Sequence, residues 1–146
     1  MTPHRPHPPQ AAPAVVLEAG VTSLAGMRRI VGEYLDQACP GADRGAVLLV
    51  VTELVTNAAR HATGWWRLSL RADYGVLTAE VEDHSTEPPR PRAPDNTTGT
   101  GGLGWHIAER LTSELRYLVH EHGKTVWASW ADPGAPPGST PSSGRY

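Results

Sequence analysis

The sequence is poor in the residues and segments that mark several common protein classes. It has a single cysteine, Cys39, which excludes an intramolecular disulfide framework and a zinc site built from several cysteines. Its longest apolar run, residues 46–51, is far shorter than the ~20 residues that a membrane-spanning helix needs. The N-terminal residues lack the apolar segment of a secretory signal. We therefore expect a cytoplasmic protein with no membrane association.

Excess positive charge is also missing, and regular structure is not expected at the two ends of the chain. The net charge of −2 argues against broad electrostatic binding of nucleic acid. The length of 146 residues fits one domain. Residues 1–13 and 132–146 are rich in proline, glycine or serine, and bury too little apolar surface to offset the entropy of ordering. We predict one domain over residues 14–131 between two disordered tails.

The apolar pattern between the tails predicts a mixture of helices and strands. The predicted helices span 24–37, with Ser23 as N-cap, then from Asp43 to about Ala62, and 103–111. The predicted strands span 14–19, 66–71, 77–83, 115–119 and 126–130. Tight turns between successive strands favour antiparallel pairing. Helices grouped on one face of a mainly antiparallel sheet give a two-layer α/β sandwich of the α+β class.

Three polar residues form a line along the second predicted helix. Glu53, Asn57 and His61 are four residues apart, so they share one side of the helix, next to its apolar face. An amide oxygen can bind Mg²⁺, and a carboxylate one turn away can hold or deprotonate a water or a hydroxyl group. The same spacing fits a solvated helix surface, because Glu and Asn are common surface residues. The spacing alone leaves both interpretations open.

Asp83 stands at the end of a predicted strand whose apolar residues alternate with polar ones. The alternation places its carboxylate on the apolar face, where it needs a partner. An exocyclic amine such as that of adenine is one candidate donor to this carboxylate. A second interpretation is that the segment from Asp83 to Ser85 forms a turn at the end of the strand.

A glycine-rich segment, residues 99–104, opens the third predicted helix after a proline-rich stretch at 87–94. Glycines allow close backbone approach to a ligand, and the N-terminus of a helix attracts phosphate. A flexible linker fits the same composition, and the Gly-Lys-Ser/Thr ending of a P-loop is missing.

The order of these features is informative. A helix with Glu-x-x-x-Asn, a hairpin that ends in Asp, a long loop and a Gly-x-Gly helix start follow one another. From about Ala14 to Trp130 the chain resembles the Bergerat (GHKL) ATP-binding fold. Residues Glu53–Ala62 resemble its N-box, Asp83 its G1-box aspartate, and Gly102–Gly104 its G2 box. The compact size of the chain and the amino-acid sequence of its N-box segment resemble the anti-sigma-factor serine kinase branch of this superfamily.

The resemblance implies a role for each motif residue. Asn57 would bind Mg²⁺ between the nucleotide phosphates, and Glu53 would be the general base toward a protein serine hydroxyl. Asp83 would accept a hydrogen bond from the adenine amino group of ATP, and Arg60 would reach a phosphate. The backbone around the phosphates would come from three successive residues: Gly102, Leu103 and Gly104.

The resemblance also implies partners and leaves two functions open. In the first, the protein is a serine/threonine kinase that phosphorylates an anti-anti-sigma (STAS-type) protein and sequesters a sigma factor, with homodimerisation. In the second, it is a non-catalytic or degenerate ATP-binding module that switches partners. The intact Glu53 favours a kinase. Ser85, where the G1 box has glycine, and a short lid over residues 86–100 favour the switch.

Overall fold

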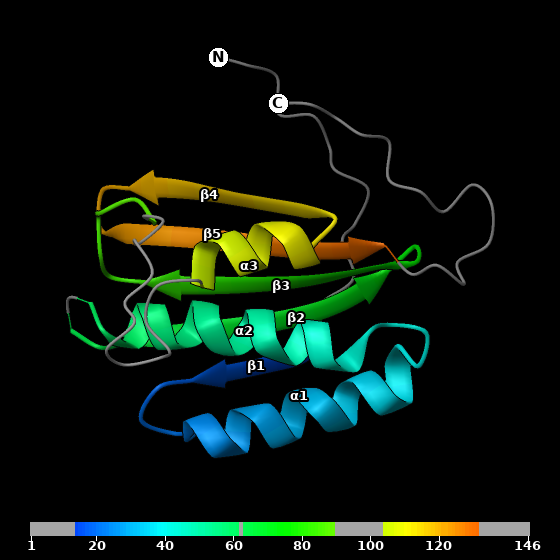
Figure 1. Cartoon of the computed structure of the whole chain (residues 1–146). Helices are drawn as coiled ribbons and strands as arrows, with labels where there is room; N and C mark the ends of the chain where they lie inside the picture. Colours follow the sequence, from blue (N-terminus) through cyan, green and yellow to red (C-terminus); the bar gives the residue numbers. More distant parts are fainter. Residues whose placement is uncertain (1–13, 62, 90–103, 132–146) are drawn as a thin grey trace, which may run out of the picture.

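A five-stranded antiparallel sheet carries the helices on one of its faces in the computed structural model, which describes residues 14–61, 63–89 and 104–131 (Figure 1). The strands are β1 (Val15–Glu18), β2 (Trp66–Asp73), β3 (Val76–Asp83), β4 (Glu114–His120) and β5 (Gly123–Ala131). The helices are α1 (Leu24–Ala38), α2 (Arg44–Ala59) and α3 (Gly104–Leu111). The strand order is β1-β2-β3-β5-β4. The predicted α+β sandwich is confirmed, while the predicted tails, 1–13 and 132–146, lie outside the described residues.

The central hairpin forms because apolar and polar residues alternate on both of its strands. Alternate residues of β2 and β3 are buried, and the two strands pair along their full lengths. Tyr74 and Gly75 join the strands with φ of 51° and 75°. Two residues with positive φ match the right-handed twist of the flanking strands, as in a two-residue hairpin turn. Both strands therefore present one apolar face to the helices.

The two long helices begin at the predicted N-caps. The Ser23 side chain accepts a hydrogen bond from the Gly26 backbone N–H at 3.0 Å. Asp43 accepts one from the Ala46 backbone N–H at 3.1 Å. Each cap satisfies a backbone donor that the first turn of a helix leaves without a partner.

Helix α2 ends three residues earlier than the sequence predicts. Its last residue is Ala59, whereas the apolar pattern extends to Ala62. The last turn tightens, because the Arg60 N–H also bonds to the Asn57 carbonyl at 3.2 Å and the His61 N–H bonds to the Ala58 carbonyl at 3.3 Å. His61 therefore follows the helix instead of standing on its surface, which corrects the predicted line of three residues.

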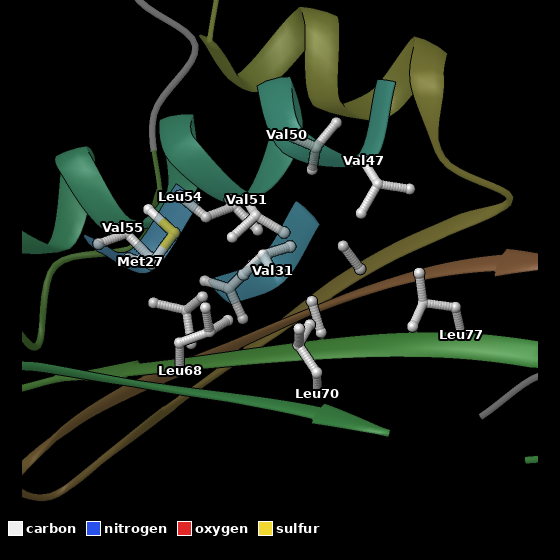
Figure 2. Close-up of a cluster of buried hydrophobic side chains, with 14 of the residues drawn as sticks. Met27, Val31, Val47, Val50, Val51, Leu54, Val55, Leu68, Leu70 and Leu77 are labelled. Carbon is white, nitrogen blue, oxygen red and sulfur yellow. The ribbon is translucent and has the colours of Figure 1, made fainter. Parts of the chain in front are cut away.

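The main core lies between α1, α2 and the sheet, as Figure 2 shows. The labelled side chains there are Met27, Val31, Val47, Val50, Val51, Leu54, Val55, Leu68, Leu70 and Leu77. The sheet surface away from the helices carries ion pairs from Arg67 to Glu18 and Glu82 and from Arg71 to Glu80. Within the described ranges, each helix is too short or too polar to cross a membrane.

Candidate functional site

Two of the predicted site residues lie together on the last turns of α2. Glu53 and Asn57 are half-buried and one helical turn apart. Within the described part of the chain, neither side chain forms a hydrogen bond or an ion pair. Arg60 is exposed at the C-cap of the same helix. Among the described residues, the end of α2 therefore presents a carboxylate and an amide whose oxygen atoms are not bound by other protein groups.

Asp83 is buried at the end of β3, as its place in the alternation predicts. One carboxylate oxygen, Oδ2, lies 2.8 Å from Nζ of Lys124. The other, Oδ1, accepts a hydrogen bond from the backbone N–H of Ser85 at 2.8 Å. The Ser85 hydroxyl in turn accepts one from the Glu87 backbone N–H at 3.2 Å. Asp83 is thus both an inward-facing carboxylate and the first residue of a turn, whereas its contact with adenine stays a prediction.

Lys124 is the partner of Asp83 that the sequence interpretation missed. It lies on β5 directly opposite Asp83 in the β3–β5 register, and its side chain is 2% exposed. Strict alternation places Lys124 on the same face as Val126 and Ala128, so the signal was present in the sequence. Strands β3 and β5 approach closely here, since there is no room for a Cβ on Gly123: it would overlap the Asp83 carbonyl oxygen. A side chain at position 123 would therefore force β5 and the end of β3 to shift apart.

A small cavity joins the end of α2 to the first residues of β5. We call it the α2–β5 cavity; its volume is about 120 Å³. Its described lining residues are Asn57, His61, Ser85, Glu87, Pro88, Pro89 and Lys124. Glu53, Arg60 and Asp83 are not among them. Among the described residues, the volume of this cavity is below the range of about 300–1,000 Å³ that is typical of small-molecule pockets.

His84, the residue after Asp83, contacts two other side chains of the protein. The His84 ring stacks on Trp65 with centroids 4.3 Å apart, and its Nδ1 lies 2.9 Å from the Thr63 hydroxyl. The Arg67 guanidinium lies over the Trp65 ring, 5.2 Å from its centroid. These contacts fix the direction in which the chain leaves β3. They therefore also help to position Ser85 at the cavity.

The predicted phosphate-binding segment is described only at its last residue. Gly104 begins α3, whereas Gly102 and Leu103 lie outside the described residues, so their role stays a prediction. Among the described residues no three His, Cys, Asp or Glu side chains gather as a metal site. Mg²⁺ in nucleotide sites is held by one or two protein oxygens together with phosphates and waters. Asn57, with its available amide oxygen, fits that donor set.

The comparisons with known proteins identify the family of the chain. Residues 17–130 match the family model of the histidine kinase-like ATPase domain, so the chain belongs to that family. It is an ATP-binding domain of the GHKL type. Among solved structures, it is similar to the histidine kinase domain of the E. coli osmosensor EnvZ, determined by NMR, with 17% identity and a TM-score of 0.48. That match covers 88% of this chain and 95% of the EnvZ domain. No curated protein sequence matches the chain.

Proposed function

We propose that this protein is an ATP- and Mg²⁺-dependent serine/threonine kinase that phosphorylates an anti-anti-sigma protein of the STAS type and sequesters a sigma factor. The observation that supports it best is the pair Glu53 and Asn57, half-buried, one turn apart and without partners in the described chain. Nucleotide binding alone does not need a general base, so the carboxylate at this place favours a kinase. The homodimer that the family resemblance implies belongs to the same proposal.

The two residues suit the two requirements of phosphoryl transfer. Such transfer depends mainly on positioning and on stabilising charge. Asn57 would hold the Mg²⁺, which when bound neutralises phosphate charge, and Arg60 would contact a phosphate. The Glu53 carboxylate would accept the proton of the attacking serine or threonine hydroxyl. The hydroxyl oxygen then forms the new bond to the γ-phosphorus, and ADP leaves with the electron pair of the broken bond.

Replacing the base tests the proposal. Glu53→Gln keeps the shape of the side chain and removes its negative charge, so it should bind ATP normally but phosphorylate the partner roughly 10²–10⁴-fold more slowly. The measurement is transfer of radiolabelled phosphate from ATP to STAS-type proteins encoded beside this one. Glu33→Gln, an exposed carboxylate on α1, is the matched control and should transfer at the wild-type rate. Equal rates for Glu53→Gln and wild type would remove Glu53 from the mechanism.

A second candidate function is a partner switch that binds ATP without transferring phosphate. It is favoured by Ser85, which is buried and tied into the turn after β3 in place of the glycine of the G1 box. This alternative predicts no transfer to any cognate partner, together with a change in partner affinity when ATP is added.

A further inference from the structure

Lys124 combines deep burial with a position on the wall of the α2–β5 cavity. It is the single lysine of the chain, and its side chain is 2% exposed. Lysines are almost never fully buried unless they are paired, and Asp83 supplies the pair at 2.8 Å. Lys124 lines the cavity, whereas Asp83 is not among the described lining residues. A ligand in the cavity can therefore contact Lys124, and the Asp83 carboxylate lies next to the lysine Nζ.

Stability of the fold alone is a weak reason for this pair. Replacing a buried ion pair by well-packed apolar residues is often neutral or stabilising, because two charges lose their hydration when they are buried. Hydrogen-bonding capacity is the property that an apolar pair would lack. An ammonium group has three N–H donors, of which the ion pair with Asp83 uses one. The Asp83 carboxylate already accepts from Lys124 and from the Ser85 backbone.

We propose that Lys124 is a base-recognition residue, which donates a hydrogen bond to the ring nitrogen N1 of adenine while Asp83 accepts one from the neighbouring exocyclic amine. This inference rests on the proposed nucleotide site and adds a second determinant to it. Adenine presents an acceptor and a donor side by side on this edge. Lys124 and Asp83, facing each other across β3 and β5, present the complementary donor and acceptor.

The test replaces one atom of the ligand. In 1-deaza-ATP a C–H group stands where ATP has N1, so the acceptor for Lys124 is lost and the exocyclic amine is kept. A hydrogen bond from a charged donor predicts that the full-length wild-type chain binds 1-deaza-ATP about 10- to 100-fold more weakly than ATP in calorimetry with Mg²⁺. Equal affinities for the two ligands would show that N1 accepts no hydrogen bond from the protein, and that result overturns the proposal.

Variants at Lys124 separate recognition from general damage to the site. Lys124→Met should bind ATP and 1-deaza-ATP with the same, weakened affinity, whereas Lys124→Gln keeps an N–H donor and should retain part of the preference for ATP. If Lys124→Met retains the full preference, another residue contacts N1 and the proposal fails. If Lys124→Met does not fold, Lys124→Gln decides instead, and a preference for ATP as full as that of wild type in this variant would overturn the proposal. Absence of binding of both ligands to the wild-type chain would overturn the nucleotide site itself, a result distinct from equal binding.

Discussion

At the scale of single residues, the partner of Asp83 determines what the candidate site can do. A carboxylate that is alone on an apolar face would attract any donor, including a ligand. Here Lys124 and the Ser85 backbone each bind one carboxylate oxygen, and each oxygen keeps a further lone pair for a donor of the ligand. The alternation rule predicts that Asp83 points inward, and it applies equally to Lys124. What the sequence does not reveal is that β3 lies next to β5, which brings the two residues face to face.

The buried ion pair of Lys124 and Asp83 predicts how substitutions change the stability of the fold. Lys124→Met leaves the Asp83 carboxylate buried without its counter-charge, which should lower the free energy of unfolding by about 3–5 kcal/mol. The double variant Asp83→Asn, Lys124→Met removes both charges and should recover most of that loss. Urea unfolding followed by circular dichroism measures all three proteins. If Lys124→Met is as stable as wild type, the two groups do not form a buried ion pair in solution.

At the scale of helices and strands, local patterns predict the elements well and their ends and neighbours less well. N-caps Ser23 and Asp43 and the turn at Tyr74 depend on side chains or backbone angles close in sequence. The end of α2 is different, because the apolar pattern continues to Ala62 while the hydrogen bonds tighten after Ala59. The β3–β5 pairing joins strands separated by a long segment, and no local signal specifies it.

Glu80, on the sheet face away from the helices, predicts that the stability of the protein depends on pH. The pKa of Glu80 is raised above its ordinary value, first because burial disfavours its charge and second because Glu82 is negative, although Arg71 opposes the shift. The native state therefore holds the Glu80 proton more tightly than the unfolded chain does. This stabilisation is complete below the ordinary pKa of 4.5 and is lost as the pH rises through the native pKa.

Glu80→Gln isolates this effect, because the variant has no proton to lose at that position. As the pH rises from 4 to 7, the stability of wild type should fall relative to that of Glu80→Gln in parallel urea titrations. Glu82→Gln, which removes the second cause of the shift, should reduce the pH dependence. A stability difference between wild type and Glu80→Gln that stays constant from pH 4 to 7 would contradict the raised pKa.

At the scale of the whole molecule, the candidate site lies where three separate elements end or begin. The C-terminal turn of α2, the last residue of β3 and the first residues of β5 meet at one end of the two-layer fold (Figure 1). None of these elements contains the site alone. The core between α1, α2 and the sheet fixes their relative positions, so the spacing of Asn57 from Lys124 depends on packing far from either residue. This dependence explains why the sequence motifs identify residues but not the cavity between them.

A ligand that binds only to this assembled site must stabilise the whole fold. Mg-ATP at 100 times its Kd should add about 2.7 kcal/mol to the free energy of unfolding, which corresponds to a rise of several degrees in Tm. Asn57→Ala removes a half-buried polar side chain that has no partner in the described chain, so the stability without ligand should stay close to that of wild type. The same variant should lose most of the increase in Tm, because its amide oxygen would hold the metal. Thr56→Ala, the adjacent substitution on α2, is the matched control and should keep the full shift. Thermal scans with and without Mg-ATP measure each protein, and an unchanged shift in Asn57→Ala would place the nucleotide site elsewhere.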